Sequence, residues 1–461
     1  MAPRAHGAAV AVAVVRAFIT WLLVADVEQL VMLPSGSAIA VDLGNTNACV
    51  AGYTGGDAQA MFHLCIPSWV AFRDDSAVLV GEDARDHAAV DPQAAVSGFK
   101  RLLGRRFDNV FHREFIQRVS ENLPHKIVEE DMNPQIEVKA KDGVFRHVGV
   151  DELTAALFAR HRDMAEARRG GDRVHAAVVP VPAQYVGDPP RQDVLFAADT
   201  TAACTYAMWV LDEPVAAAAA AYGLHRKLRD GGNAVVLHVG GAAAARHVEF
   251  FFGGDDFDHK IMDYFIGLIR DEHGRDIGSD TAALMKLRTA CEHAKKTLSD
   301  QDHVQVIIES LVDGVDLSER LTRAKFEGLC HDLFVKVVDL VDRVMLQQAE
   351  LKKNKDLIDE IVFIGGRTMI PKIRELIKGY FDGKELNTKL KPDEAVALGG
   401  ALLSHHTANG YPCMGVDNRH QIGGKITYLP LQSDPIPDLP LQKRKSHIYH
   451  RFANNTRICH C

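Results

Sequence analysis

Three apolar segments of the sequence each end in a turn that contains glycine, a pattern that suits the binding of phosphate groups. Glycine permits positive φ angles and has no side chain, so backbone N–H groups in such a turn can approach phosphate oxygens closely. The first turn also follows Asp42, and a carboxylate at the end of a strand can hold a hydrated Mg²⁺, which prefers oxygen ligands. An ordinary turn after a strand would explain any one of these elements alone. The segments and their glycines are Ala38–Asp42 with Gly44, 234–239 with Gly240 and Gly241, and 361–364 with Gly365 and Gly366.

The segments around these turns indicate how the chain positions them. The first two turns lead into apolar segments of β type, 48–52 and 246–252, so we expect two glycine-tipped hairpins. The third leads into a helix that should begin near Pro371, because proline is favourable in the first turn of a helix. Apolar residues recur at steps of three and four within 326–353, which predicts a long helix with one buried face. Similar hairpins in the two halves predict a duplicated α/β architecture with a cleft between two lobes.

The bulk properties exclude some classes of function. A chain of 461 residues can bury a large core and should form more than one domain or lobe. Its formal net charge of −8 argues against a general nucleic-acid-binding protein, which would carry a basic stripe. The eight cysteines are scattered without a CxxC pair or another metal-ligand spacing, which favours a reduced, cytoplasmic protein over a disulfide scaffold.

The two ends of the chain differ from its middle. Residues 8–25 are apolar, but Arg16 divides them, and neither half approaches the roughly 20 apolar residues of a membrane-spanning helix. A cleaved signal and a disordered extension both stay open for this segment. After about residue 405 the sequence shows no sustained period of either kind. We therefore expect a leader or disordered extension over 1–36, a folded domain over 37–405 and an irregular tail over 406–461.

Eight sequence motifs follow one another along the folded part. They are DLGNTNAC (42–49), IPSWVAF (66–72), VGED (80–83), FKRLLGRRF (99–107), EPVAAAAAAYGL (213–224), GGDDFD (253–258), LRTACEHAKKTLS (287–299) and GKELNTKLKPDEAVALGG (383–400). In this order they resemble the ATPase domain of the heat-shock 70-kDa chaperone family, over roughly residues 37 to 405. The resemblance implies an actin-like, two-lobed ATPase fold of the α/β class, built from duplicated ribonuclease-H-like halves. It also implies that ATP or ADP, with Mg²⁺, binds in the cleft between the lobes.

The resemblance assigns roles around the phosphates. Asp42 would face the hydration shell of Mg²⁺, and Glu213 would help to orient the metal and the attacking water. Lys100 matches a lysine that reaches the γ-phosphate, where a point charge suits the transition state. The first phosphate hairpin would consist of Gly44, Asn45, Thr46 and Asn47, although the family usually has threonine at the position of Asn45.

The adenosine pocket is implied by two further segments. One is a helix face on which the residues stand at i, i+3, i+4 and i+7, namely Glu292, Lys295, Lys296 and Ser299. There Lys296 replaces an arginine whose flat guanidinium would stack on the adenine. The other wall would comprise Gly365, Gly366, Arg367, Met369 and Asp393. In this wall Arg367 and Met369 stand where the family has serine and arginine, so a second flat guanidinium is missing.

The second hairpin departs furthest from the family pattern. It keeps Gly240 and Gly241, but His238, Ala242, Ala243 and Ala245 replace an aspartate, a glycine, a threonine and a second aspartate. Imidazole is a poor ligand for Mg²⁺, and the alanines lack the hydroxyl and carboxylate groups of the family. Loss of one such group costs about 10²–10³ in rate. We therefore expect hydrolysis to be very slow or absent, with weaker nucleotide binding left open.

Several functions stay open on this basis. The chain could be an ATP-dependent folding chaperone of the stress response, reduced to its nucleotide-binding domain, or a non-catalytic module that binds nucleotide and co-chaperones. A small-molecule kinase of the same superfold and a decayed gene product also stay open.

The expected partners follow from the same resemblance. They are nucleotide and co-chaperones of the nucleotide-exchange and J-domain types. Pro182 and Arg191 resemble residues that couple the ATP state to a neighbouring domain, with altered spacing. No nucleic acid or membrane partner is expected. Peptide clients stay in doubt, because no peptide-binding domain is expected in the tail.

Overall fold

A computed structural model describes most of the middle of the chain. Residues 1–37, which include the apolar segment 8–25, lie outside the described residues, as does most of the sequence after residue 408. The described residues are 38–54, 61–73, 77–140, 143–181, 207–213, 216–217, 220, 233–238, 253–278, 280–346, 352–387, 391–408 and 425–429. None of the helices in these ranges is both long and apolar enough to cross a membrane.

A five-stranded sheet contains the first glycine hairpin. Its strand order is β11-β10-β1-β2-β3, with β1–β2 and β2–β3 antiparallel and β1–β10 and β10–β11 parallel. The strands are β1 (Ala38–Asp42), β2 (Asn47–Tyr53), β3 (Met61–Pro67), β10 (Ala176–Val181) and β11 (Ala207–Asp212). The range predicted for β1 is confirmed, as is the hairpin from β1 into β2.

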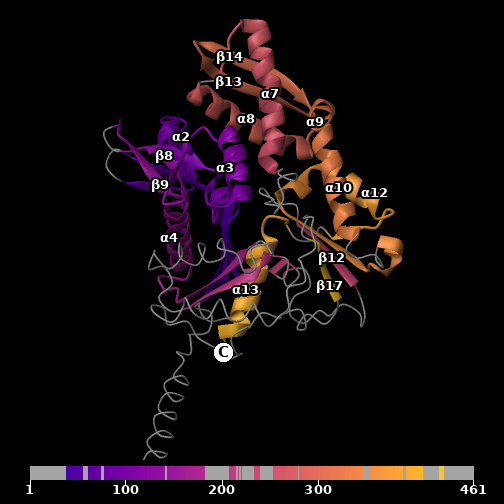
Figure 1. The fold of residues 1–461 in the computed structure, drawn as a ribbon. Helices are drawn as coiled ribbons and strands as arrows, with labels where there is room; N and C mark the ends of the chain where they lie inside the picture. The colour runs from indigo at the N-terminus through magenta and orange to yellow at the C-terminus, as the bar shows by residue number, and fades with distance from the viewer. Residues whose placement is uncertain are drawn as a thin grey trace, which may run out of the picture.

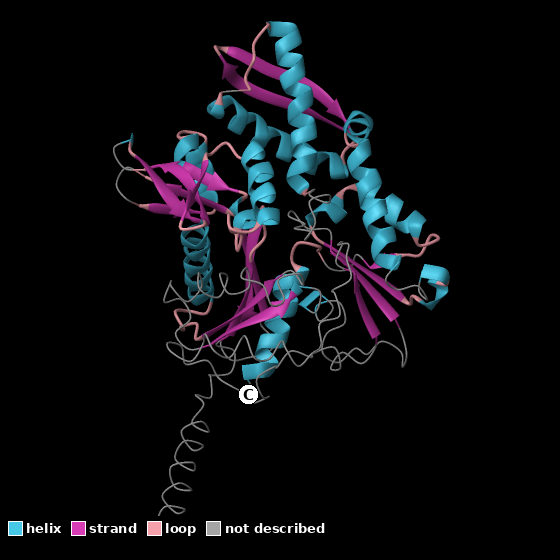
Figure 2. Cartoon of the chain, viewed as in Figure 1, coloured by secondary structure: helices cyan, strands magenta, loops and turns pink. Residues whose placement is uncertain are grey.

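Both faces of this sheet are covered, because side chains alternate between the faces along each strand. Ile39 and Val41 pack with α4 (Val150–Arg168) in one core, and Ala40 packs with α13 (Ala395–Ala408) in another. Figure 2 shows the two helices on the two sides of the sheet. Two-sided burial explains why the sequence of β1 is a continuous apolar run and not an alternating one.

A second sheet contains the strands before the other two glycine turns. It has the order β16-β15-β12-β17 and is parallel throughout. Its strands are β12 (Asn233–His238), β15 (Glu360–Ile364), β16 (Leu386–Asn387) and β17 (Lys425–Leu429). The prediction that β15 leads into a helix at Pro371 is confirmed, because α12 spans Pro371–Tyr380. The segment 246–252, predicted to return as the second arm of the second hairpin, lies outside the described residues.

The tail expected to be irregular contributes to this sheet. The expectation is wrong for Lys425–Leu429, which forms β17 and pairs in parallel with β12, and α13 extends to Ala408. The segment KITYL holds isoleucine, threonine and tyrosine, which favour strands, and the open edge of β12 supplies its hydrogen-bonding partner. Short isolated strands of this kind carry too little periodicity to be recognised without their neighbours.

Smaller elements surround the two sheets. Three further sheets join β4 with β5 and β6, β7 with β8 and β9, and β13 with β14. These strands are β4 (Trp69–Phe72), β5 (Val78–Val80), β6 (Ala95–Ser97), β7 (Ile127–Glu130), β8 (Asn133–Lys139), β9 (Phe145–Gly149), β13 (His303–Val312) and β14 (Val315–Thr322). The remaining described helices and 3₁₀ turns are α2 (Glu82–Ala88), η1 (Pro92–Ala94), η2 (Phe99–Leu102), α3 (Val110–Asn122), α7 (Gly254–His273), α8 (Thr281–Asp300), α9 (Arg323–Leu329), α10 (His331–Leu346), η5 (Lys355–Leu357) and η6 (Gly366–Met369).

The long helix predicted within 326–353 is two helices. α9 ends at Leu329 and α10 begins at His331, with Cys330 between them at φ −98° and ψ 12°. The carbonyl of Cys330 accepts from the N–H groups of both Leu333 and Phe334, which starts a new helical ladder. The apolar face predicted for this segment is buried on both helices, so the periodicity identified the face but not the break.

The two larger sheets meet through α13. Figure 1 shows α13 between β12 and the strands of the five-stranded sheet. One buried cluster joins Ala40 and Val178 of one sheet with Val236 and Ile364 of the other, together with Ala395 at the start of α13.

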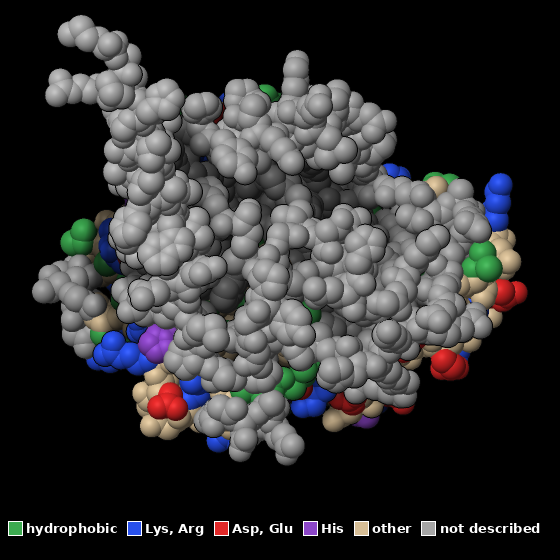
Figure 3. Space-filling view, turned by 90° about the horizontal axis from the view of Figure 1, so that it is seen from below, with side chains coloured by type: hydrophobic (Ala, Val, Ile, Leu, Met, Phe, Trp, Pro, Cys, Tyr) green, Lys and Arg blue, Asp and Glu red, His purple; other side chains and the backbone are tan. Residues whose placement is uncertain are grey.

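The face seen in Figure 3 mixes exposed Lys and Arg with Asp and Glu along its margin, and its described residues form no uniformly basic patch.

Two consecutive glycines allow α13 to lie this close. A Cβ at Gly399 would lie 1.6 Å from the carbonyl oxygen of Ala216, and one at Gly400 would lie 2.8 Å from the Cβ of Ala40. These distances are far below van der Waals contact, and the first involves a backbone atom that cannot rotate away. The LGG motif before residue 401 is therefore a packing requirement of this helix.

We predict that Gly399→Ala lowers the free energy of unfolding by about 2 kcal/mol or more, because the added methyl forces α13 away from Ala216. The matched control is Gly267→Ala in the interior of α7, where a Cβ would meet no atom within 4 Å. That substitution should be neutral or stabilise by up to about 1 kcal/mol, because alanine is the better helix former. Denaturant unfolding of the full chain measures both, and equal effects would contradict the close approach.

Candidate functional site

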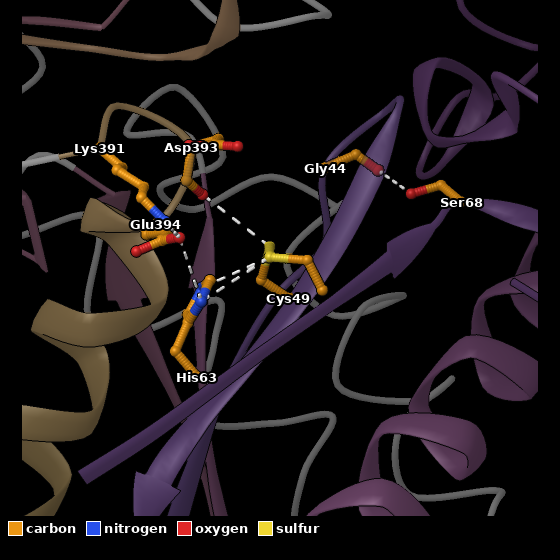
Figure 4. The surroundings of a disulfide bond; sticks show 8 residues. Gly44, Cys49, His63, Ser68, Lys391, Asp393 and Glu394 are labelled. Atoms are coloured by element: carbon orange, nitrogen blue, oxygen red, sulfur yellow. Dashed lines mark hydrogen bonds and ion pairs between the residues drawn. A yellow bond between two sulfur atoms is a disulfide. The ribbon is translucent and has the colours of Figure 1, made fainter. Parts of the chain in front are cut away.

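The turn between β1 and β2 is held tightly by its own backbone and by Ser68. A Cβ at Gly44 would lie 1.9 Å from the carbonyl oxygen of Asn47, so this turn accepts only glycine there. Ser68 Oγ donates to the Gly44 carbonyl (2.7 Å), and the Ser68 N–H donates to the Thr46 carbonyl (2.8 Å). Figure 4 shows Ser68 directed at Gly44. The IPSWVAF motif thus braces the turn, a role that its sequence alone did not indicate.

The structure brings two of the predicted catalytic residues together beside this turn. Lys100 Nζ, on η2, lies 3.5 Å from Glu213 Oε1, which follows β11 directly. Both side chains are largely buried, at 16% and 5% exposure, so this ion pair is shielded from solvent. Gly44, Asn45 and Lys100 line one small hollow. Asp42, at the end of β1 on the same sheet, is half-buried.

A buried carboxylate that sequence reasoning missed connects this region to α7 and α8. Asp255 Oδ2 accepts from Asn45 Nδ2 (3.1 Å) and lies 3.2 Å from Arg101 Nη2 and 3.6 Å from Arg288 Nη2. Burial alone would raise the pKa of Asp255, but Arg101 and Arg288, with Lys295, hold that pKa down to about 2. Two features of the sequence could have indicated this cluster. One is the pair of acidic residues in GGDDFD at a helix start, and the other is Arg101, directly after Lys100.

On the helix face predicted to bind adenosine, Lys295 contacts α7, whereas Glu292 and Lys296 pair with each other. Lys295 Nζ lies 2.6 Å from Asp258 Oδ2 and donates to the Gly254 carbonyl (3.0 Å), so this lysine connects α8 to α7. Burial raises the pKa of Asp258 to about 7, although Lys295 acts in the opposite direction. Glu292 and Lys296 pair at 2.7 Å, and Lys296 is well exposed. Ser299 Oγ donates to the Lys295 carbonyl at 3.5 Å.

The other predicted wall is partly buried. Gly365 has a φ of 95° and donates its N–H to the carbonyl of Pro392 (2.9 Å), the residue directly before Asp393. Arg367 is 4% exposed, and burial lowers its pKa to about 10, while nearby Asp256 acts in the opposite direction. Met369 is 42% exposed, and Gly366 is also exposed. Arg367 therefore lies in the interior, whereas Met369 presents an apolar surface to solvent.

The second hairpin is described only at its start. His238 ends β12 and lies opposite Ile364 in the parallel pair β12–β15. The end of β12 therefore lies beside the end of β15, directly before Gly365. Gly240, Gly241, Ala242, Ala243 and Ala245 lie outside the described residues, as do Pro182 and Arg191.

Next to the first hairpin, the structure contains a disulfide between Cys49 on β2 and Cys65 on β3. The expectation of reduced cysteines is wrong for this pair, whereas Cys291 and Cys330 are free and buried. The two residues lie directly opposite each other in the antiparallel ladder, with Cα atoms 4.1 Å apart, which permits the bond. Their separation of 16 residues carried no such signal, because the pairing depends on the register of β2 and β3.

Comparison with known proteins agrees with the motifs and the architecture. The family model described as Hsp70 protein matches residues 38–409. The chain belongs to the Hsp70 family. The resemblance to the heat-shock 70-kDa family and the expected mixed α/β content are thereby confirmed, and the fold is the actin-like ATPase fold of that family.

Three curated Hsp70 proteins illustrate the similarity. Heat shock 70 kDa protein BIP3 of rice (Oryza sativa subsp. japonica) is 40% identical over 388 residues, which cover 80% of this chain and 56% of that protein. A heat shock 70 kDa protein of Neurospora crassa is 33% identical over 91% of this chain and 67% of its own length. Heat shock 70 kDa protein 2 of Paracoccidioides lutzii is 34% identical over 91% of this chain and 66% of its own length. This Hsp70 chain thus spans between about half and two thirds of these relatives.

We predict that Asp255→Asn destabilises this Hsp70 chain by about 2 kcal/mol at pH 7, because the pKa of Asp255 falls from 3.8 to about 2 on folding. Because the pKa of Asp255 is lower in the folded chain than in the unfolded chain, its ionised carboxylate stabilises the fold above about pH 4, and this stabilisation is lost as the pH falls toward 2. The difference between variant and wild type should therefore shrink over that window. Unfolding measured at pH 7, 4 and 2 tests this, with exposed Asp263→Asn on α7 as a control that should stay near wild type at all three.

Proposed function

We propose that the chain binds ATP or ADP with Mg²⁺ in a cleft between two lobes that are duplicated ribonuclease-H-like halves. One lobe carries the β1–β2 hairpin, and the other carries β12 and β15. The single observation that supports this best is the position of the Lys100 ammonium, which lies beside the Gly44 turn and is paired with Glu213. The Hsp70 family binds ATP or ADP with Mg²⁺, and the family model covers Gly44, Lys100 and Glu213.

The residues at the first hairpin fit a phosphate group and a hard cation. Glycine at position 44 lets the turn close on itself, because a Cβ there would lie 1.9 Å from the carbonyl oxygen of Asn47. Backbone N–H groups of such a tight turn can bind phosphate oxygens. Asp42, half-buried at the end of β1, offers carboxylate oxygens of the kind that Mg²⁺ prefers. Bound Mg²⁺ would neutralise phosphate charge. Glu213, buried and held at Lys100, would orient a water molecule with its carboxylate and keep the lysine in place.

For the adenosine, we propose a reduced version of the family's pocket. Lys295 is engaged by Asp258 and Gly254, so we assign it a positioning role between α7 and α8. Glu292 and Lys296 remain to meet the ribose, and exposed Met369 offers a soft apolar surface to a purine. Arg367 is buried and would not stack on the base. Without two guanidinium faces, the base should bind more weakly than in a family member that has both.

Catalysis is the step that we propose is impaired. His238 and the alanines at 242, 243 and 245 leave the second hairpin without the carboxylates and hydroxyl that the family pattern places there. Asp42, Lys100 and Glu213 on the first side are all present. Positioning groups that act as a unit are not additive, so loss of one side can remove most of the rate. We propose binding with very slow or absent hydrolysis.

Two biological roles follow from these properties. The first is a molecular chaperone of the stress response that uses ATP in protein folding, and it is supported by relatives that are named heat shock 70 kDa proteins. The second is a non-catalytic module that binds nucleotide and contacts co-chaperones of the nucleotide-exchange or J-domain type. The alanine-rich segment 242–245 favours the second role.

The cytoplasmic location expected from the scattered cysteines remains a proposal. The Cys49–Cys65 disulfide favours an oxidising compartment instead, because disulfides persist there and are rare in the cytosol. Imaging of the tagged full-length chain distinguishes the two locations.

We predict that Lys100→Ala weakens ATP binding roughly 10- to 100-fold and ADP binding much less, because the lost charge–phosphate contact concerns the γ-phosphate. Isothermal titration of the full chain with Mg²⁺–ATP and Mg²⁺–ADP measures both affinities. Lys126→Ala, a surface lysine that is 66% exposed, should bind both nucleotides like the wild type. Equal losses for the two nucleotides would place Lys100 away from the γ-phosphate.

We predict that His238→Asp, Ala242→Gly and Ala243→Thr, introduced together, raise the single-turnover rate of ATP hydrolysis by about 10²-fold or more. The reason is that the three changes restore a metal-shell carboxylate, a close backbone approach and a hydroxyl near the γ-phosphate. The same variant carrying Lys100→Ala serves as the control and should lose the gain. A wild-type chain that already hydrolyses ATP as fast as the restored variant would refute the proposed impairment.

A further inference from the structure

A cluster of metal-binding groups lies at the edge of the first sheet, apart from the proposed phosphate site. Cys49 and Cys65 face each other on β2 and β3, and His63 stands two residues before Cys65, so all three side chains lie on one face of the sheet. His63 Nε2 lies 3.4 Å from Cys65 Sγ. The ligand atoms of the three residues all lie within 4.8 Å of one another.

A fourth group reaches this cluster from the turn before α13. Glu394 Oε1 lies 3.8 Å from His63 Nδ1, and the carbonyl oxygen of Asp393 lies 3.9 Å from Cys49 Sγ. Figure 4 shows the histidine between Glu394 and the sulfur atoms, with Asp393 and Lys391 on the same turn. The two sulfur atoms and the imidazole thus lie together on β2 and β3, and Glu394 contacts the imidazole from the turn before α13.

These four groups form a donor set typical of zinc. Zn²⁺ binds cysteine sulfur at about 2.3 Å and histidine nitrogen or carboxylate oxygen at about 2.0–2.2 Å, usually with four ligands in a tetrahedron. Ligand atoms in such a tetrahedron lie roughly 3.3–3.8 Å apart. His63 Nε2 and Cys65 Sγ already have this spacing at 3.4 Å, whereas the two sulfur atoms, 2.09 Å apart in the disulfide, must separate on reduction. Small side-chain rotations would bring the atoms into range. Cys65 is exposed, which gives a metal ion an entry path, while Cys49 is buried against α13.

The disulfide and a metal ion would compete for the same sulfur atoms. A phosphine reductant supplies two electrons to the disulfide, and with one water molecule it yields two thiols and the phosphine oxide. Binding of Zn²⁺ to the two thiols then releases two protons, because the metal takes thiolates. The disulfide-bonded form has no thiolate to offer, so the oxidation state of the pair decides whether the site can form.

We propose that the reduced chain binds one Zn²⁺ through Cys49, His63 and Cys65, with Glu394 as the fourth ligand, and that the Cys49–Cys65 disulfide excludes the metal. The sequence showed no metal-ligand spacing, because His63 comes 14 positions after Cys49 and only the β2–β3 register brings them together. This site is distinct from the proposed nucleotide site, and its test needs no nucleotide. Failure of one proposal therefore leaves the other standing.

Cobalt titration of the reduced full chain tests the proposal. Because Cys459 and Cys461 flank His460 in the tail and could bind metal themselves, all variants carry Cys459→Ser and Cys461→Ser. We expect one Co²⁺ per chain, with a thiolate-to-cobalt charge-transfer band in the near ultraviolet that one equivalent of Zn²⁺ abolishes. The disulfide-bonded chain should show no band. A reduced chain without the band would overturn the proposal.

Single substitutions identify the ligands. Cys65→Ser and His63→Ala should each weaken Co²⁺ binding at least about 10-fold, and Cys65→Ser should also diminish the charge-transfer band. Glu394→Gln should weaken binding about 10-fold, and an unchanged affinity would remove Glu394 from the site. The controls are Cys330→Ala, a buried free cysteine, and His147→Ala, an exposed histidine on β9, both of which should bind as the parent does. Retention of the full band in Cys65→Ser would refute the assignment.

Discussion

The carboxylate of Asp255 joins four separate parts of the chain, its own helix and three others. Asn45 comes from the first glycine turn, Arg101 from η2, and Arg288 from α8, while Asp255 itself lies in the first turn of α7. A buried carboxylate is costly unless it is paired and hydrogen-bonded, so each partner is needed for the others to remain buried. The turn and Lys100, which is adjacent to Arg101, are thereby fixed relative to α7 and α8. Asn45, where the family usually has threonine, supplies the amide that reaches Asp255.

A second constraint is the close approach of α13 to the strands around it. Gly399 and Gly400 bring the helix backbone against Ala216 and Ala40, and the same helix begins just after Glu394. The proposed adenosine wall, the five-stranded sheet and the core between the two sheets therefore share one rigid element. A shift of α13 would move all three, which explains why a helix of such low polarity contains two adjacent glycines despite their low helix propensity.

The sequence predicted local elements well and distant contacts poorly. The bounds of β1, the hairpin at Gly44 and the helix at Pro371 follow from apolar patterning and from glycine and proline, which act over a few residues. The break at Cys330 depends on a shared carbonyl, and β17 depends on the open edge of β12, and neither leaves a periodic signal. The roles of Lys100 and Glu213 were expected only through the family. Their pairing and the Asp255 cluster were not expected at all, because both require the folded arrangement of segments more than 100 residues apart.

The pairing of Cys49 with Cys65 could not be predicted from the sequence either, because it depends on the register of β2 and β3. Their position in the sheet also connects these cysteines to the proposed phosphate site. Asp42 lies opposite Cys49, and Cys49 lies opposite Cys65, so the three side chains stand in one row on one face of the sheet. With the disulfide, neutral His63 and ionised Glu394, the cluster has a net charge of −1. Zn²⁺ with two thiolates, His63 and Glu394 has the same net charge. An exchange of disulfide for metal would thus leave the electrostatic field at Asp42 nearly unchanged and would act through geometry, by changing the spacing of β2 and β3 and the position of the turn before α13.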